Sequence, residues 1–174
     1  MQLSQAVSLI KTDHFSYSTH QNWADLGCGT GTFTLALAVL LQAPSIIHAV
    51  DKDEAALYKI PTQHNEITIE KRRGDFIKED LAFTNLDGIL IANALHYVKD
   101  KATLIQKLQS YLHGTGCFLI VEYETDAANP WVPYPIRFQA LEGLFHDMGF
   151  KKVEKLGELP SRYQGEMYAA LVRK

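Results

Sequence analysis

The chain has 174 residues, with 17 Lys and Arg against 20 Asp and Glu, and 47% of its residues are apolar. This length predicts one domain over residues 1–174, because such a chain can bury about 70% of the surface that its unfolded form exposes. The net charge of −3 argues against a nucleic-acid partner, which requires a strongly basic face.

Targeting and membrane signals are also missing from the sequence. Met1–Leu9 has no cationic stretch followed by an apolar core, so we expect no signal peptide. The apolar run Phe33–Leu41 is far shorter than the ~20 residues of a membrane span. Cys28 and Cys117 are too few for a disulfide framework or a zinc cluster. These features predict a cytoplasmic protein with no membrane partner and no metal.

The first half of the chain alternates apolar runs with helical patterns. The predicted helices are Met1–Lys11, Phe33–Leu41 and one for which Asp53 is the N-cap. The predicted strands are Trp23–Leu26, Ile46–Val50, Ile67–Lys71 and Leu86–Ala92. The last of these is almost entirely apolar, as is typical of a central strand in a parallel sheet.

The second half continues this alternation. A helix over Lys101–Leu112 is expected to stop at Gly114, and a strand follows over Cys117–Glu122. After a proline-rich segment, a last helix ends at Gly149 and two strands cover Lys151–Leu156 and Met167–Val172. The pattern predicts a doubly wound α/β fold whose sheet has seven mostly parallel strands, with an antiparallel pair at the C-terminus.

A glycine-rich turn, Asp25-Leu-Gly-Cys-Gly-Thr-Gly31, separates the first strand from the next helix. Glycines at this position let the backbone approach a ligand that a Cβ would exclude, and the helix start offers unpaired N–H groups. A dinucleotide fingerprint requires glycine where Thr32 stands, which disfavours a nicotinamide-dependent oxidoreductase. A phosphate-binding P-loop would require a lysine. A structural turn without a ligand remains an alternative.

At this turn the sequence resembles the class I S-adenosylmethionine-dependent methyltransferases, whose first motif it matches residue for residue. The resemblance extends from about Trp23 to Phe150 and implies a Rossmann-like fold and S-adenosylmethionine as the cofactor. It places the methionine part of the cofactor against Gly27, Cys28, Gly29 and Gly31. The leading acid, Asp25, is expected near the amino group of that part.

Two further acidic positions follow predicted strands. Asp51, next to Lys52, ends the second strand, where a carboxylate can accept hydrogen bonds from a ribose diol. The resemblance assigns the same role to Asp51; Asp53 is the rival, although it is better placed as a helix cap. Asp75 and Phe76 follow the third strand and suit an adenine, one through its carboxylate and the other through its ring.

The fourth strand ends in Asn93-Ala94-Leu95-His96-Tyr97. The resemblance places Asn93 and Ala94 against the cofactor, facing the methyl group. Family members that methylate nucleobase amines carry Asn/Asp-Pro-Pro-aromatic here, so this chain does not resemble them. His96 is a candidate general base, along with Glu122 and Tyr123; the alternative for His96 is a backbone-bonded residue at a helix start.

The segment after the fifth strand and the last loop supply candidate substrate contacts. Trp131 and Tyr134 are expected to form an apolar wall over the sulfonium, or else to pack as a lid on the core. Arg137 or Arg162 is expected to hold a substrate carboxylate, or else to be solvated.

Together these features predict methyl transfer from S-adenosylmethionine to an O or N atom of a small molecule by in-line displacement. We expect a monomer or a homodimer. A protein that binds the cofactor without catalysis is the alternative from a different functional class.

Overall fold

The computed structural model describes residues 1–17, 19–161 and 165–174. Its strands are β1 Asn22–Leu26, β2 Ile46–Asp51, β3 Gln63–His64, β4 Ile67–Arg73, β5 Leu86–Ala92, β6 Leu112–Tyr123, β7 Lys152–Pro160 and β8 Glu166–Arg173. They form one eight-stranded sheet in the order β3-β4-β2-β1-β5-β6-β8-β7. The five strands from β4 to β6 in this order are parallel, and β3, β7 and β8 pair antiparallel. The predicted mostly parallel α/β sheet with an antiparallel C-terminal pair is confirmed.

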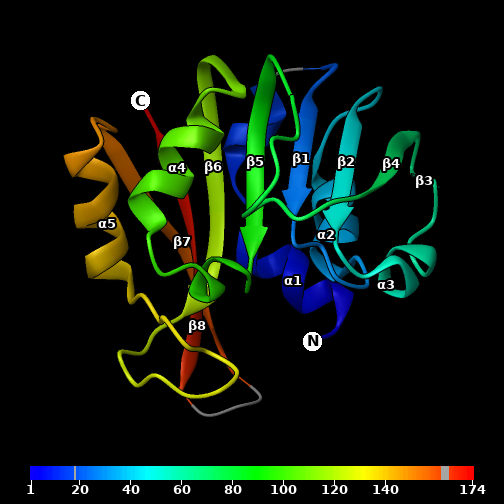
Figure 1. Cartoon of the computed structure of the whole chain (residues 1–174). Helices are drawn as coiled ribbons and strands as arrows, with labels where there is room; N and C mark the ends of the chain where they lie inside the picture. The colour runs from blue at the N-terminus through cyan, green and yellow to red at the C-terminus, as the bar shows by residue number, and fades with distance from the viewer. Residues whose placement is uncertain (18, 162–164) are drawn as a thin grey trace.

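Helices cover both faces of this sheet (Figure 1). They are α1 Leu3–Ile10, α2 Thr32–Leu40, α3 Glu54–Tyr58, α4 Lys101–Gln109 and α5 Phe138–Asp147, with short 3-10 helices at Asp13–Tyr17 and Leu95–Tyr97. Figure 1 shows α4 and α5 in front of the sheet, while α1 and α2 lie behind it. The fold is therefore doubly wound, as the sequence predicts.

The alternation of side chains along the central strands explains the two layers. On β5, Ile89 and Ile91 belong to the buried cluster that contains Leu104 of α4. The intervening Leu90 belongs to the cluster on the other face, which contains Leu37 of α2. Because successive strand residues point to opposite faces, a strand that is apolar at every position can bury both sides. Burial of both faces holds the carboxyl ends of the central strands in place.

The sheet has eight strands instead of the predicted seven, because β3 adds a two-residue strand at one edge. His64 pairs with Ile67 across a turn formed by Asn65 and Glu66, whose φ angles are 47° and 63°. Two successive positive φ values are typical of a tight hairpin turn, which usually carries Asn-Gly. Glu66 replaces that glycine, and the sequence therefore lacks the hairpin signal.

The predicted helix Lys101–Leu112 is too long, since α4 ends at Gln109. Leu112 instead begins β6 and pairs with Leu86 of β5. The turn between them is held by Tyr111, whose hydroxyl donates to Asp80 (2.7 Å) and accepts from the Leu81 N–H (3.1 Å). These contacts come from 30 residues away in the chain, which explains why helical spacing alone misplaces the boundary.

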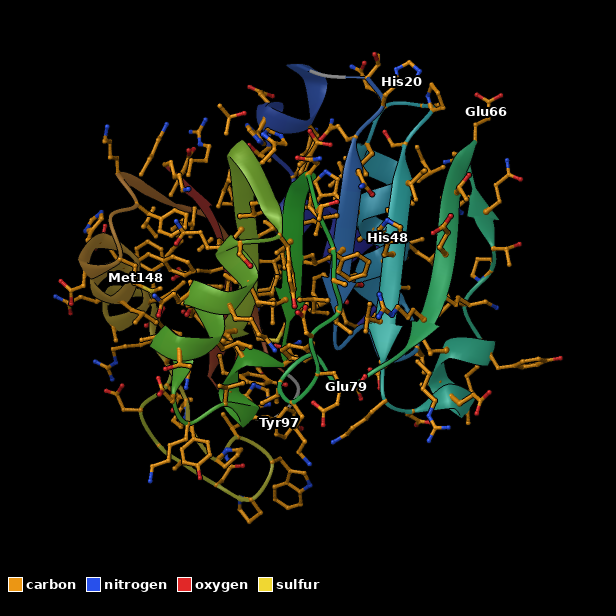
Figure 2. The ribbon with its side chains drawn as sticks, turned by 45° about the horizontal axis from the view of Figure 1, so that its top comes forward. His20, His48, Glu66, Glu79, Tyr97 and Met148 are labelled. Atoms are coloured by element: carbon orange, nitrogen blue, oxygen red, sulfur yellow. The ribbon has the colours of Figure 1, made fainter. Side chains whose placement is uncertain are left out.

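The carboxyl ends of the parallel strands meet at one edge of the sheet. Tyr97 and Glu79 lie at this edge in Figure 2, and His20 and Glu66 lie at the opposite one. The strand β1 has β2 on one side and β5 on the other, so the chain reverses its direction of winding there. Ligands of open α/β sheets bind outside the carboxyl ends of the strands at such a switch point.

Candidate active site

The glycine turn between β1 and α2 is built from three residues in left-handed conformations. Gly27, Gly29 and Gly31 have φ angles of 77°, 54° and 85°. A Cβ on Gly27 would lie 2.7 Å from the Cβ of Ala94, and one on Gly31 would lie 2.8 Å from Ile60, so close packing requires both glycines. A Cβ on Gly29 would meet no described atom within 4 Å. Gly29 is therefore the position where the backbone borders open space.

Asp25, the acid that leads this turn, is fully buried. Its Oδ2 accepts a hydrogen bond from the Thr34 hydroxyl (2.6 Å), whereas its Oδ1 has no partner among the described residues. Burial raises the pKa of Asp25 to about 7, although the Thr34 bond opposes the rise; the charge of Asp51 adds to it. A buried carboxylate with a free oxygen is a good site for a cationic group.

Asp51 at the end of β2 is held by two backbone groups. Its Oδ2 accepts from the Gly29 N–H (2.8 Å) and its Oδ1 from the Asp53 N–H (2.9 Å). Asp53 itself caps α3, accepting from the Ala55 and Ala56 N–H groups. The prediction that Asp53 is the cap is confirmed. Because a carboxylate oxygen has two lone pairs, each oxygen of Asp51 keeps one for a ligand.

Two cavities lie beside these residues and meet at Gly27 and Asn93. The smaller, of about 340 Å³, is lined by Asp51, Lys52, Asp75, Phe76, Ala94 and Tyr97. The larger, of about 700 Å³, is lined on its cofactor-motif side by Asp25, Cys28, Gly29 and Thr30. The structure thus brings all the predicted cofactor residues except Gly31 to the walls of two connected cavities.

Asn93 lies at the junction of the cavities in an uncommon backbone conformation. Its φ angle is 52°, and its N–H donates to the Val121 carbonyl (2.8 Å), which joins the end of β5 to β6. Its side-chain oxygen is buried without a hydrogen-bond partner in the described part of the chain. Buried polar atoms are usually paired, so this oxygen and Oδ1 of Asp25 both indicate that a ligand completes the site.

Asp75 and Phe76 occupy the loop after β4. The Asp75 Oδ1 accepts from the N–H groups of Ile77 (3.1 Å) and Lys78 (3.4 Å), which fixes the turn. The Phe76 ring is buried against the glycine turn, with a ring carbon 3.3 Å from where a Cβ of Gly27 would lie. The loop therefore presents a carboxylate oxygen and an aromatic ring to the same cavity.

His96 lies behind the cavity walls and is absent from the described lining of either cavity. The ring Nδ1 of His96 is 2.8 Å from one carboxylate oxygen of Glu122, and the backbone N–H of His96 donates to the other oxygen (3.0 Å). Both side chains are buried. The imidazole packs against the rings of Tyr97 (4.3 Å between centroids) and Tyr123 (5.7 Å between centroids). Of the predicted bases, only Tyr123 lines the larger cavity.

Three of the predicted substrate residues, Trp131, Tyr134 and Arg137, lie outside the described cavity walls. Trp131 is 76% exposed, and the Tyr134 N–H donates to the His96 carbonyl (3.0 Å). Arg137 forms an ion pair with Asp126. The remaining prediction, Arg162, lies outside the described residues. The backbone of the aromatic loop is therefore hydrogen-bonded to the short 3-10 helix that follows β5, while the Trp131 side chain is largely exposed to solvent.

The larger cavity has a second set of walls that the sequence did not indicate. They come from the start of α1, from α2 and from the facing ends of β7 and β8, and they include Gln2, Gln5, Phe33, Leu159 and Met167. In the sequence, the one indication of these walls is that Gln2 and Gln5 stand three residues apart at the start of a helix, and such polar pairs are too common to identify a ligand site. Phe33 lies beside the glycine turn along the chain, whereas the pairing of β8 with β6 and the packing of α1 against α2 and β7 bring the other segments there.

The α-helices in the part of the chain that the structure describes are between five and ten residues long. None of them combines the length and hydropathy that crossing a bilayer demands. This part of the chain also contains no group of three or more His, Cys, Asp or Glu arranged to hold a metal ion.

Comparison with known proteins gives one family and one fold. A family model described as a methyltransferase domain matches residues 18–157. An uncharacterised methyltransferase of Mycobacterium bovis is 27% identical over 101 residues, which cover 58% of this chain and 50% of that protein. The chain therefore spans about half the length of the curated relatives it matches.

Solved structures of methyltransferases share the fold. The CurJ carbon methyltransferase superposes with a TM-score of 0.71 and 16% identity, covering 90% of this chain and 49% of that one. The magnesium protoporphyrin IX methyltransferase from Synechocystis, solved with bound S-adenosylmethionine, superposes with a TM-score of 0.70 and 14% identity. The match covers 99% of this chain and 78% of that one.

The region matched by the family model contains the glycine turn, the ends of β2, β4 and β5 and most of the sheet. The resemblance predicted from the motif at residues 25–31 is therefore confirmed by an independent match over most of the chain. This protein belongs to the methyltransferase domain family.

Proposed function

We propose that this chain transfers a methyl group from S-adenosylmethionine to a small-molecule acceptor, at an O or N atom, by in-line displacement. The observation that carries the proposal is the pair of cavities that meet at Gly27 and Asn93, with the unpaired oxygen of Asp25 on the wall of one. Both volumes fall in or near the range of small-ligand sites, about 300–1,000 Å³.

The residues of the smaller cavity suit an adenosine. Asp51, oriented by two N–H groups, offers one lone pair on each oxygen to the hydroxyls of a ribose, and Lys52 lies beside it. Asp75 Oδ2, which lies 3.9 Å from the Lys78 ammonium, can accept from the amino group of an adenine, and Phe76 and Ala94 provide apolar contact for its ring.

The residues of the larger cavity suit the amino-acid part of the cofactor. The unpaired Oδ1 of Asp25 fits a positively charged amino group, and the space beside Gly29 admits a chain close to the backbone. When bound, S-adenosylmethionine supplies a methyl carbon attached to a positively charged sulfur. The protein's task is then to align the acceptor and exclude water, and such positioning is worth about 7–11 kcal/mol.

We propose that Tyr123 contacts the acceptor and that His96 is a positioning residue. The Tyr123 side chain lines the larger cavity, and the imidazole that packs against its ring is fixed by both oxygens of Glu122. Where the acceptor is a hydroxyl group, Tyr123 is the nearest candidate among the predicted bases to assist loss of its proton.

The test is calorimetry followed by a transfer assay with the purified full chain. S-adenosylmethionine and S-adenosylhomocysteine are expected to bind, NAD is not, and radiolabelled methyl should appear in molecules of a metabolite extract. Binding of NAD alone would refute the proposal. Binding of both adenosyl compounds without label transfer would favour a non-catalytic binding protein.

Several other predictions belong to the same proposal. We propose one domain over residues 1–174, a monomer or homodimer, and a cytoplasmic protein whose cysteines, Cys28 and Cys117, are buried and free. Size-exclusion chromatography with light scattering measures the oligomeric state directly, and a mass above that of two chains would contradict the prediction.

A further inference from the structure

A short turn between β4 and β5 carries the two residues assigned above to the adenine. The carbonyl oxygen of Asp75 accepts from the N–H groups of Lys78 (3.0 Å) and Glu79 (2.8 Å), which closes a single turn over residues 75–79. The Asp75 N–H in return donates to Oε1 of Glu79 (3.1 Å). We call residues 75–79 the adenine turn; it lies at the carboxyl edge of the sheet, where Figure 2 labels Glu79.

A turn of this length cannot satisfy its own later carbonyl groups. Lys107 of α4 supplies the missing donors. Its Nζ donates to the carbonyl oxygens of Phe76 (2.7 Å), Ile77 (3.3 Å) and Glu79 (2.9 Å). No other hydrogen bond to these three oxygens is found among the described residues. Because an ammonium group has three donors, one side chain can satisfy all three carbonyls.

Lys107 itself is anchored in a well-packed part of the fold. Its neighbours on α4, Ile105 and Leu108, are fully buried in the core cluster that also contains residues of β5 and β6. Four residues after Lys107, the Tyr111 hydroxyl donates to Asp80, which directly follows the adenine turn (2.7 Å). The segment from α4 to the start of β6 therefore holds the turn at two successive points.

Two of the three carbonyls bound by Lys107 belong to residues on the wall of the smaller cavity, Phe76 and Ile77, and Asp75 lines the same wall. The Phe76 ring packs against the glycine turn while its carbonyl is bound to Lys107, so both ends of this residue are fixed. We propose that Lys107 is a positioning residue for the cofactor, a role that rests on the methyltransferase function proposed above. Lys107 holds the adenine turn so that the Asp75 carboxylate faces the amino group of the adenine.

Loss of the Lys107 ammonium should change the selection of the base more than the binding of the rest of the cofactor. In Lys107→Met the side chain stays unbranched and apolar along its length, but the three carbonyls lose their donors. The adenine turn then relaxes, and Oδ2 of Asp75 loses its fixed position. Asp51 and the glycine turn are held by other contacts, so the ribose and the amino-acid part keep theirs.

The test compares S-adenosylhomocysteine with S-inosylhomocysteine by calorimetry on the purified full chain. In the second compound a carbonyl replaces the amino group of the base, so the group that donates to Asp75 is lost. The wild type is expected to bind the adenosyl compound at least about tenfold more tightly. Lys107→Met should weaken the adenosyl compound about tenfold and the inosyl compound less than about threefold. Equal weakening of both compounds, an unchanged preference in the variant or no preference in the wild type would overturn the role.

Two further lysine variants separate a specific effect from a general one. Lys101→Met is the matched control, because Nζ of Lys101, also on α4, donates to the carbonyls of Val98 and Tyr134 (2.8 Å each), outside the adenine turn. It should keep the wild-type preference, and a loss equal to that in Lys107→Met would refute a specific role. Lys107→Arg replaces the methionine variant if that chain does not fold. A planar guanidinium cannot direct its donors to all three carbonyls, so the preference should fall at least about threefold; the wild-type preference would refute the role.

Asp75→Asn tests the contact through which Lys107 acts. Its Oδ1 can still accept from the N–H groups of Ile77 and Lys78, whereas an amide that donates replaces Oδ2. We expect this variant to prefer the inosyl compound, and retention of the wild-type preference would overturn the role of Lys107. Failure of the proposed function has a different signature, since the wild-type chain would then bind neither compound and transfer no radiolabelled methyl, and the role of Lys107 would fall with it.

Discussion

Replacement of Asp25 by asparagine should stabilise the fold while removing the cofactor's cationic partner. The pKa of Asp25 rises from 3.8 in the unfolded chain to about 7 in the folded protein, mainly through burial. The folded state therefore binds more protons between these two values, and its stability falls as pH rises through this window. Above pH 7 the ionised Asp25 carboxylate lowers the free energy of unfolding by at most about 4 kcal/mol, because each unit of pKa difference between the folded and unfolded states corresponds to about 1.4 kcal/mol.

The difference in free energy of unfolding between Asp25→Asn and the wild type is best measured as a function of pH. An asparagine does not titrate, and its side-chain oxygen can still accept from the Thr34 hydroxyl. The gain in free energy of unfolding of Asp25→Asn over the wild type should therefore grow by about 2 kcal/mol between about pH 5.5 and about pH 8. Urea denaturation of both proteins at the two pH values gives this difference.

A control and a binding assay complete the experiment. Asp126→Asn removes a carboxylate that is 63% exposed, so its stability difference from the wild type should change little with pH. Calorimetry should show that Asp25→Asn has lost most of its affinity for S-adenosylmethionine. Equal stability differences at the two pH values would refute the inferred burial of a titrating carboxyl, and wild-type affinity would refute its contact with the amino group.

Three further substitutions test the cofactor and acceptor contacts. Asp51→Ala should weaken S-adenosylmethionine binding by about 1–3 kcal/mol in calorimetry, whereas Asp53→Ala should cost about 1 kcal/mol of stability as a lost helix cap; unchanged affinity in the first would transfer the ribose role to Asp53. Gly29→Val should abolish binding by filling the open space at that position, while Gly114→Val, also beside open space, should not; normal affinity in Gly29→Val, with circular dichroism confirming the fold, would place the ligand elsewhere. Tyr123→Phe keeps the ring on His96 but should lower turnover on a hydroxyl acceptor by on the order of 100-fold without changing cofactor affinity; unaltered turnover would exclude the hydroxyl group.

Local patterns in the chain were sufficient to predict most of the fold. Apolar runs of strand length alternate with helical spacing, and burial of both faces of the central strands requires the layers that the structure contains. The Asp53 cap is also local, because its hydrogen bonds lie within three residues. The glycine turn could be identified from contiguous residues, although its packing also involves Ile60 and Ala94. These features could therefore be predicted without knowledge of any distant contact.

The remaining features depend on contacts between residues far apart in the chain. The sequence predicts His96 as a candidate base, whereas the structure shows that Glu122, 26 residues later, contacts its imidazole and that His96 does not line the described cavities. The walls of the larger cavity combine the start of α1 with the ends of β7 and β8, which meet because β8 pairs with β6 and α1 packs against β7 and α2. A side chain's neighbours and burial depend on such pairings, and spacing along the sequence carries no record of them. The residues of the cofactor turn are contiguous, so their chemistry could be predicted from the sequence. The shape and lining of the rest of the larger cavity depend on how the strands and helices assemble.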